Sequence, residues 1–382
     1  MHIITIYTLY NRRAGAELCF EKTIESISSL YPDVKWTVLC NKQAQNILKE
    51  NFSFVNPIYL SQLDSQYKKA FWLEFHANSL VDSFGADCFW IPSGTNHFPG
   101  NWKIPTLTTF HDLGEYHIKN KYGLSRTIFR KYICIPRSVK RSSAFTAVSN
   151  FTLKDMEQIL FIKENAKVVY NGKSPHKKIQ SFNSKALIKD QYNLISQSYL
   201  FVPGRTDYIG KGLDILLNAF TRFQENNPYV KLVFVGPEGI EHDLLIQQIK
   251  NNNNLKNNVL YLGRVGNEEL AALYENCLMT IISSRFEGFG FPVLEAMEYE
   301  VPIVCSDAGA LPEIAGKGAL IFKSGNDLDL YSKMLDIANN PELKKCLLEN
   351  GKVQLTCFSW ENCAQGMMDM FNLIITQRSN KL

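Results

Sequence analysis

Short apolar segments alternate with helix-length amphipathic stretches along most of this chain. In its first half, the apolar segments that predict strands are residues 3–9, 36–40, 88–91, 106–110, 144–148 and 168–170. Helical patterns lie between several of them, at residues 16–30, 69–83 and 152–160. Such alternation is typical of a parallel sheet that is covered by helices on both faces.

A polar stretch, residues 173–197, follows and has no strong apolar period, so we interpret it as a linker with room for one short helix. A second alternating series then begins. Its predicted strands are 199–202, 231–235, 259–262, 279–282 and 303–305, and its predicted helices are 213–224, 243–250, 268–276, 292–299, 328–338 and 341–354. The pattern predicts an α/β protein with two Rossmann-like domains, residues 1–180 and 181–357, facing each other across a cleft.

The composition agrees with two globular domains and narrows the class of protein. The 382 residues exceed what one core accommodates, and 45% hydrophobic and 20% charged residues are ordinary for a globular chain. There is no apolar run of about 18 residues and no signal-peptide pattern at the start. Nine cysteines without a Cys-x-x-Cys pair favour free thiols in the cytoplasm. A net charge of +4 is too small to indicate a nucleic-acid partner.

Two glutamates in the segment 283–297 are the strongest candidates for chemistry. Glu287 is predicted on a glycine-rich loop after a buried strand, and Glu295 on the first turn of the next helix. Unpaired amides of such a turn attract phosphate, while the carboxylates can accept hydrogen bonds from hydroxyl groups. The layout therefore predicts a sugar-nucleotide site. The alternative is that both are ordinary surface carboxylates, with Glu295 paired with a lysine and Glu287 facing water.

The same segment resembles the Glu-x7-Glu signature of the retaining glycosyltransferases of family 4, which have the GT-B fold. The resemblance implies that Glu287 lies beside the donor sugar and its phosphates, with Gly288, Phe289 and Gly290 in the same donor-binding loop. It implies that Glu295 holds the ribose hydroxyls. It also implies that the last segment, residues 358–382, forms a terminal helix that crosses back to complete the first domain, and that the enzyme needs neither metal nor cofactor.

Two cations follow the strand predicted at residues 199–202. Arg205 lies in a glycine turn, and Lys211 precedes the next helix. Cations at a helix entrance can neutralise a diphosphate, and an arginine can do so with two parallel hydrogen bonds, although both could also be solvated surface residues. Both match the Gly-Arg…Lys-Gly element of the family, which implies that they bind the donor diphosphate and stabilise the leaving group.

Weaker candidates lie on other strand ends. His111 and Asp112 match the His-Asp-Leu segment of the family, which implies a catalytic position for His111 beside the reacting sugar, although a lone histidine is more often structural. Gly15 and Asp112 are expected on the acceptor side, but relatives carry two adjacent glycines where this chain has Ala14-Gly15-Ala16. Arg264 and Val265 match a loop that contacts the nucleobase, and an ordinary turn fits them equally well.

Two other patterns are rejected as functional signals. The two carboxylates of Asp327-Leu328-Asp329 could suggest a metal site, but they open a helical run, so helix capping and first-turn charge explain them better. Gly288-Phe289-Gly290 lacks the third glycine of a dinucleotide fingerprint. No metal site and no nicotinamide site are therefore predicted.

A basic stretch, residues 119–141, contains eight basic and no acidic residues, with apolar side chains between them. It could lie on an anionic bilayer, or it could be an amphipathic helix packed on its own sheet with a solvated basic face. The resemblance favours the inner leaflet of the membrane, because many relatives extend glycans on lipid carriers there.

Together these patterns predict a cytoplasmic glycosyltransferase, peripheral on the membrane face, which is retaining and metal-independent. It would move a hexose, with mannose as a candidate, from a GDP- or UDP-linked sugar to a hydroxyl of a lipid-linked surface glycan such as an O-antigen or capsule precursor. The alternatives are a sugar-nucleotide epimerase or a phosphorylase of the same fold, or a non-catalytic sugar-nucleotide-binding subunit.

Overall fold

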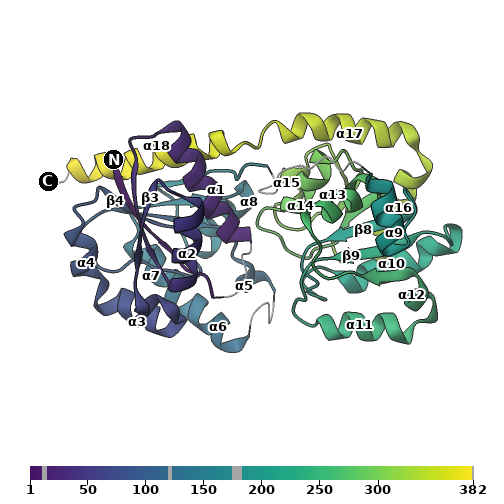
Figure 1. The fold of residues 1–382 in the computed structure, drawn as a ribbon, viewed down its shortest axis with the longest axis horizontal. Helices are drawn as coiled ribbons and strands as arrows, with labels where there is room; N and C mark the ends of the chain where they lie inside the picture. The colour runs from purple at the N-terminus through teal and green to yellow at the C-terminus, as the bar shows by residue number, and fades with distance from the viewer. Residues whose placement is uncertain (11–14, 119–122, 174–182, 381–382) are drawn as a thin grey trace. The chain divides into compact units, whose positions relative to one another are not determined.

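The chain divides into two compact units in the computed structural model, which describes residues 1–10, 15–118, 123–173 and 183–380 (Figure 1). Unit 1 comprises Met1–Pro175 and Phe358–Leu382, and unit 2 comprises His176–Cys357. The boundary predicted between residues 180 and 181 lies outside the described residues. Each unit is built around its own parallel sheet, as the alternating pattern predicts.

Unit 1 contains a seven-stranded parallel sheet in the order β3-β2-β1-β4-β5-β6-β7. Its strands are β1 (His2–Tyr7), β2 (Lys35–Cys40), β3 (Val55–Tyr59), β4 (Cys88–Ile91), β5 (Thr106–Phe110), β6 (Ala144–Ala147) and β7 (Ala166–Val168). The strand order reverses between β1 and β4, which are hydrogen-bonded neighbours. Ligands of open parallel sheets bind outside the carboxyl ends of the strands at such a reversal.

The helices of unit 1 cover both faces of this sheet. They are α1 (Gly15–Leu30), α2 (Lys42–Asn51), α3 (Gln66–Phe75), α4 (Ala77–Ser83), α5 (Gly114–His117), α6 (Leu124–Ile128), α7 (Ile135–Arg141), α8 (Asn150–Ile159) and α18 (Trp360–Ser379), with a 3-10 turn η1 (Ser61–Asp64) and a π-helical turn η2 (Phe129–Cys134). Figure 1 shows α18 in yellow lying along α1. Phe371 of α18 packs edge-on against Trp36 and Trp90, so the end of the chain is part of the core of unit 1.

Unit 2 contains a six-stranded parallel sheet in the order β10-β9-β8-β11-β12-β13. Its strands are β8 (Tyr199–Pro203), β9 (Lys231–Val235), β10 (Val259–Tyr261), β11 (Met279–Ile282), β12 (Ile303–Ser306) and β13 (Leu320–Phe322). Its helices are α9 (Ser184–Tyr192), α10 (Leu213–Asn226), α11 (His242–Asn251), α12 (Asn253–Asn258), α13 (Asn267–Asn276), α14 (Phe291–Glu298), α15 (Leu311–Ala315), α16 (Asp327–Asn339) and α17 (Pro341–Leu355). Its strand order reverses between β8 and β11.

The expected elements are present, with a few differences that have local causes. Strand β3 was not expected because Pro57 interrupts its pattern, but β3 is an edge strand, where proline is tolerated. Strand β13 is also at an edge and has only three residues. The helix predicted at 69–83 is divided into α3 and α4, because the backbone of His76 leaves the helical region.

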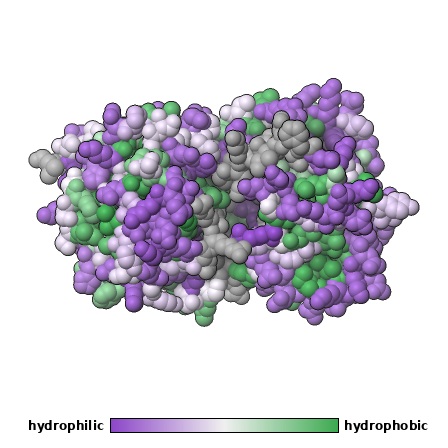
Figure 2. Space-filling view, in the orientation of Figure 1, coloured by the Kyte–Doolittle hydropathy of each residue, from purple (hydrophilic) through white to green (hydrophobic). Residues whose placement is uncertain are grey.

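The surfaces of both units are mainly hydrophilic on the face shown in Figure 2, with hydrophobic patches between the polar residues. Several large apolar side chains are exposed, including Tyr67, Phe71 and Phe75 along α3 and Leu124 and Tyr132 in the basic stretch. Among the helices formed by the described residues, none combines the length and the apolar character that crossing a bilayer requires.

Candidate functional site

Lys211 and Glu287 meet where the strand order of unit 2 reverses. Lys211 lies on the loop after β8, and Glu287 lies on the loop after β11. The Lys211 ammonium donates to Glu287 Oε1, and the hydroxyl of Ser284 donates to the same oxygen at 2.7 Å. Their side chains are 28% and 17% exposed, so the pair is shielded but open to a ligand. This is the position at which open α/β sheets bind ligands.

Glycines bring the loops of this pair into close contact. Gly212, at φ +61°, lies so near the Ser283 carbonyl that a Cβ would come within 2.2 Å of its oxygen. Gly309, on the loop after β12, has φ +63°, and a Cβ there would lie 2.1 Å from the Glu287 carbonyl oxygen. The Ala310 amide donates to that carbonyl at 2.9 Å. The loops after β8 and β12 therefore pack against the loop that carries Glu287, and both close contacts require glycine.

Arg205 lies on the same loop as Lys211 but is held by a different carboxylate. Its Nε and a terminal nitrogen contact Asp207 Oδ2 at 2.9 and 2.7 Å, and its side chain is 47% exposed. The other oxygen of Asp207 accepts from the Ile240 amide at 2.7 Å. The described contacts thus place Arg205 beside Asp207 and Lys211 beside Glu287, rather than both cations on one carboxylate.

Glu295, on the first turns of α14, accepts a hydrogen bond from the hydroxyl of Tyr274 at 2.7 Å. Tyr274 belongs to α13, is fully buried and stacks on Tyr299 with ring centroids 5.1 Å apart. Burial, followed by the charge of Glu295, raises the pKa of Tyr274 well above its ordinary value, so this hydroxyl remains a donor. Sequence reasoning missed Tyr274, because its position on the inward face of a helix resembles that of an ordinary core residue.

Gly290, which has φ +103°, is the N-cap residue of α14, and Phe291 and Pro292 are the first two residues of the helix. Proline fits the first turn, since it lacks only a donor that would have no helical partner there. A Cβ on Gly290 would lie 2.8 Å from the Leu311 side chain. The predicted glycine-rich turn therefore exists, with Gly288 and Phe289 between it and Glu287.

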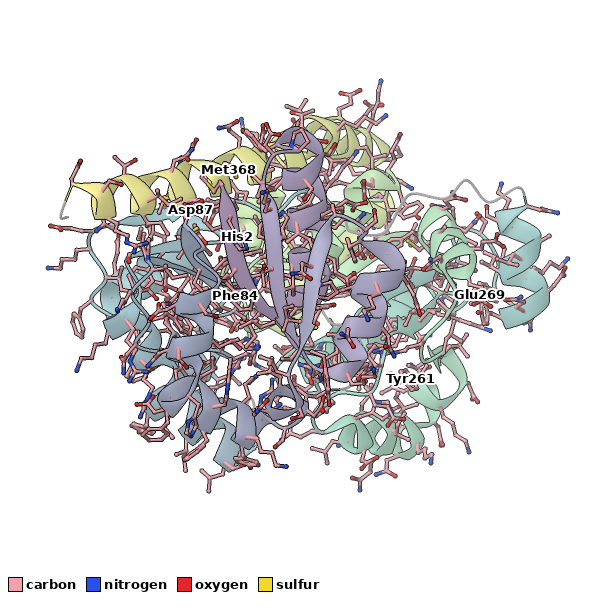
Figure 3. The ribbon with its side chains drawn as sticks, turned by 60° about the vertical axis from the view of Figure 1, so that its left-hand side comes forward. His2, Phe84, Asp87, Tyr261, Glu269 and Met368 are labelled. Carbon is pink, nitrogen blue, oxygen red and sulfur yellow. The ribbon has the colours of Figure 1, made fainter. Side chains whose placement is uncertain are left out.

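The residues predicted to contact the nucleobase, Arg264 and Val265, also lie at the carboxyl ends of the unit 2 strands, but they follow β10 at the outer side of the sheet. Arg264 is exposed and Val265 half-buried, after β10. The loop before them is tied to the loop after β9, because the Gly236 amide donates to the Gly263 carbonyl at 2.8 Å. Tyr261, labelled in Figure 3, donates to the Gly236 carbonyl at 3.1 Å. Strand β10 lies two strands from β8, a separation of about 10 Å.

The remaining predicted residues lie in unit 1. His111 follows β5, and its Nε2 lies 2.9 Å from the Pro92 carbonyl, which can only accept, so Nε2 carries the proton. Burial lowers the pKa of His111, and the neutral ring leaves Nδ1 as an acceptor. Asp112 accepts from the Gly114 amide at 2.8 Å and orders the start of α5. Gly15 is the first residue of α1, with open space where a side chain would lie.

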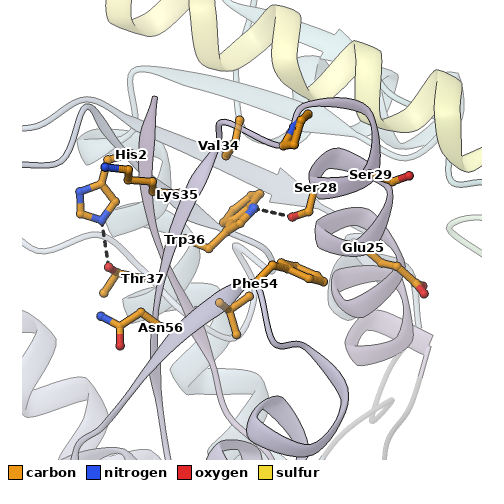
Figure 4. A pocket seen from close by; sticks show the side chains of 12 residues that line it. His2, Glu25, Ser28, Ser29, Val34, Lys35, Trp36, Thr37, Phe54 and Asn56 are labelled. Atoms are coloured by element: carbon orange, nitrogen blue, oxygen red, sulfur yellow. Dashed lines mark hydrogen bonds between the residues drawn. The ribbon is translucent and has the colours of Figure 1, made fainter.

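A hollow of about 900 Å³ lies at the amino-terminal ends of strands β1, β2 and β3 of the unit 1 sheet (Figure 4). It is lined by residues at the starts of the strands, including His2 and Lys35, and by Trp36, whose ring nitrogen donates to Ser28 of α1 at 3.0 Å. None of the predicted site residues belongs to its described lining. The chemistry is therefore concentrated at the carboxyl ends of the strands and not in this hollow.

The two carboxylates of Asp327-Leu328-Asp329 open α16, as predicted. Asn326 caps this helix by accepting from the Leu328 and Asp329 amides at 3.1 and 3.0 Å. Among the described residues, no group of three or more histidine, cysteine, aspartate or glutamate side chains could hold a metal ion.

The basic stretch forms α6, η2 and α7, and several of its cations face inward. Arg130 is buried, donates to Thr95 Oγ1 at 2.7 Å and lies 3.5 Å from a carboxylate oxygen of Glu115. Arg137 and Arg141 both bind Glu74 of α3, at 2.8 Å, and hold the pKa of that carboxyl at about 2. A uniformly solvated basic face is therefore wrong for this part of the stretch. Residues 119–122 lie outside the described ranges.

Comparisons with known proteins identify the family of this chain. Residues 184–354 match the family described as Glycosyl transferases group 1, and residues 33–176 match Glycosyltransferase Family 4. An uncharacterised glycosyltransferase of Methanocaldococcus jannaschii is 31% identical over 274 residues, covering 70% of this chain and 68% of that protein. The O-antigen chain mannosyltransferase B of Escherichia coli is 27% identical over 300 residues, covering 75% and 74%.

Solved structures show the same fold. The sucrose-phosphate synthase of Thermosynechococcus elongatus superposes with a TM-score of 0.76 at 17% identity, covering 98% of this chain and 99% of that one. Anabaena HepE, in complex with UDP and glucose, superposes with a TM-score of 0.73 at 18% identity, covering 97% and 99%. The two Rossmann-type sheets, the family matches and these neighbours lead to one conclusion: the chain belongs to glycosyltransferase family 4 and has the GT-B fold.

Proposed function

We propose that this glycosyltransferase is a retaining, metal-independent enzyme that transfers a hexose from a nucleotide-diphosphate sugar to a hydroxyl of a lipid-linked surface glycan. The observation that carries the proposal is the contact between Lys211 and Glu287 at the strand reversal of unit 2. A cation and a carboxylate that lie together in a shielded position can bind both parts of a sugar phosphate, the phosphate and the sugar. The ammonium meets the phosphate, and the carboxylate accepts from sugar hydroxyls.

The proposed chemistry follows from where charge develops. The bond between the anomeric carbon and the diphosphate oxygen breaks, and a bond from that carbon to the acceptor oxygen forms on the same face. The acceptor proton passes to the departing diphosphate. Lys211, Arg205 and the amides at the start of α14 stabilise the negative charge on the leaving group, so no enzyme nucleophile and no metal are required. The neutral His111 is proposed to accept a hydrogen bond from a hydroxyl of the reacting sugar.

The donor nucleotide is proposed to lie along the carboxyl edge of the unit 2 sheet. Glu295, held by the Tyr274 hydroxyl, accepts from the ribose hydroxyls. Arg264 and Val265 contact the base, since the separation of about 10 Å between β8 and β10 is of the order that the diphosphate and ribose require. Mannose is the favoured hexose, because a relative is an O-antigen chain mannosyltransferase, and both GDP and UDP remain candidate carriers.

Membrane contact is proposed for the inner leaflet through α6 and η2. Leu124, Ile128 and Tyr132 are exposed there. Tyr67, Phe71 and Phe75 form a second exposed apolar row on α3, which is joined to α7 by the Glu74 ion pairs. Apolar and aromatic side chains near cations are typical of surfaces that lie on anionic bilayers. A cytoplasmic location accords with this and with nine free cysteines.

Product analysis tests the proposed reaction. The protein is incubated with GDP-mannose or UDP-glucose and a lipid-linked glycan acceptor, with and without EDTA, and the product linkage is assigned by NMR. We expect transfer that EDTA does not inhibit, with the anomeric configuration of the donor retained. An inverted linkage or an EDTA-sensitive reaction would refute the mechanism. Interconversion of the nucleotide sugar without an acceptor would favour an epimerase, and donor binding without turnover a non-catalytic subunit.

Vesicle binding tests the membrane contact. The triple variant Leu124→Ser, Ile128→Ser and Tyr132→Ser is compared with wild type for cosedimentation with vesicles of phosphatidylglycerol and phosphatidylethanolamine. We expect the variant to lose most of the binding, because each apolar side chain removed from the bilayer surface costs about 1–3 kcal/mol. Equal binding by both proteins would exclude this surface.

A further inference from the structure

Lys69 of α3 is a buried cation that forms no ion pair with a carboxylate among the described residues. It is 4% exposed, and its ammonium lies 5.1 Å from the centre of the Tyr10 ring. The charge of Glu17 favours its protonated form, and the charge of Arg126 opposes it. Burial lowers the pKa of Lys69 to about 8, so it is still largely protonated at neutral pH. A buried charge is costly unless an opposite charge compensates it. The position therefore favours the arrival of an anion.

Two further buried polar groups beside Lys69 lack a well-formed hydrogen bond. The Tyr10 hydroxyl and the Nδ1 atom of His97 are both inaccessible to solvent and make no hydrogen bond of good geometry, with Thr8 near the first and the Ser93 carbonyl near the second. His97 lies close to Lys69, because the Lys69 charge contributes, after burial, to the lowered pKa of His97. The Nε2 atom of His97 is 3.1 Å from the hydroxyl of Thr8. Buried polar groups are nearly always bonded, so several groups in one place without a well-formed hydrogen bond indicate a missing ligand.

These residues lie at the position in unit 1 where a ligand is expected. Thr8 and Tyr10 follow β1, and His97 lies on the loop after β4. These two strands are the neighbours at which the strand order reverses. The crevice outside the carboxyl ends of such strands is the usual ligand position of an open parallel sheet. All of these residues belong to unit 1.

The neighbouring charged residues indicate the charge of the ligand that this position would bind. Arg130, also buried, is compensated by Glu115 at 3.5 Å and donates to Thr95 at 2.7 Å. Lys69 has no equivalent partner in the described part of the chain. Lys69 therefore has no carboxylate at ion-pair distance, and only the more distant charge of Glu17 offsets it. A phenol that can donate and a hydroxyl that can donate or accept lie beside it.

We propose that Lys69 and Tyr10, with Thr8 held by His97, bind an anionic group of the acceptor substrate, a phosphoryl or a carboxylate group. Lys69 supplies up to three hydrogen bonds and the charge, and Tyr10 supplies one hydrogen bond. The assignment to the acceptor rests on the proposed function, because the nucleotide sugar is assigned to unit 2. It implies that the enzyme selects acceptors that carry a negative charge.

Thermal unfolding with inorganic phosphate or acetate, against chloride at equal ionic strength, tests this site. Wild type is compared with Lys69→Met, with Tyr10→Phe and with Lys68→Met, which removes the exposed neighbouring lysine of α3 as a matched control. Phosphate also stabilises proteins nonspecifically, and that part of the shift is common to all variants. We expect Lys69→Met to need at least about ten-fold more anion than wild type or Lys68→Met for a half-maximal specific shift.

The two anions identify the class of ligand. A specific shift with phosphate assigns a phosphoryl group, and one with acetate assigns a carboxylate. Should Lys69→Met fail to fold, Tyr10→Phe replaces it, since that variant keeps the ring and loses only the hydroxyl. Shifts that are the same in all four proteins would overturn the anion site. A titration with nucleotide sugars runs in parallel: if wild type binds none of them, the proposed function fails, and the anion site is judged by its own titration.

Discussion

Lys211, Glu287 and Gly309 show how single residues determine the geometry of the candidate donor site. The carboxylate accepts from Lys211 and Ser284, while its own backbone is held by the Ala310 amide. Gly309 makes that backbone contact possible, because any side chain at φ +63° would be strained and would also meet the Glu287 carbonyl. The sequence indicated both charged residues, but not the glycine on a third loop that positions one of them.

Replacement of Gly309 tests this dependence. Gly309→Ala should lower the free energy of unfolding by about 1–3 kcal/mol and weaken nucleotide-sugar binding, since strain and steric overlap both act at Glu287. The control is Gly325→Ala, at φ +88° in the same unit, where a Cβ meets nothing within 4 Å. Urea unfolding and calorimetric titration measure the two effects. If the two alanine variants lose the same stability and bind donor equally, the close approach of Gly309 has no role in the site.

The loops after β1 and β4 and the helix α3 form a polar layer in unit 1 that periodicity alone could not predict. Sequence patterns located β1 and β4 to within a few residues, because buried strands are apolar. Lys69 falls within the pattern expected for a helix at 69–83, but nothing in that pattern shows that its ammonium is buried. Burial depends on which loops fold over a helix, and that is set by tertiary packing.

Two histidines at the carboxyl ends of the unit 1 strands, His97 and His111, predict a dependence of stability on pH. Burial lowers the pKa of both His97 and His111 from 6.5, so the folded state binds fewer protons than the unfolded state. Their contribution is complete above pH 6.5 and is lost as the pH falls below it. Glu74, with a pKa lowered from 4.5 to about 2, contributes above pH 4.5 and is lost separately towards pH 2. His97→Gln removes one buried titrating group and should reduce the loss between pH 7.5 and 5.5.

Urea unfolding of both proteins at the two pH values measures this effect. His117 provides a control, because it is an exposed histidine of the same unit, whose ring nitrogen lies 2.7 Å from Asp155. A loss of stability on acidification that is as large in His97→Gln as in wild type would contradict the assignment to His97.

At the scale of the whole molecule, the sequence predicted two parallel α/β sheets, their strand ends and most of the residues now proposed for the donor site. Periodicity suffices for this, because each sheet is buried on both faces and its loops carry the polar residues. The sequence did not indicate Tyr274, because its hydroxyl lies among core positions. It did not indicate Asp207 either, because its partner Arg205 was expected to contact only the diphosphate. Contacts between residues distant in sequence leave no periodic signal.

The most direct test of the central claim is calorimetric binding of GDP-, UDP- and ADP-sugars to wild type, Lys211→Met and Lys352→Met, with and without EDTA. Lys352 is exposed and pairs with Glu300, away from the loops of the candidate site, so its loss is a matched control. We predict that one nucleotide binds, that EDTA has no effect, and that Lys211→Met weakens binding by about 10–100-fold while Lys352→Met does not. Equal affinities of the two variants, or no binding by any of the proteins, would contradict the assignment of the donor site to Lys211 and Glu287.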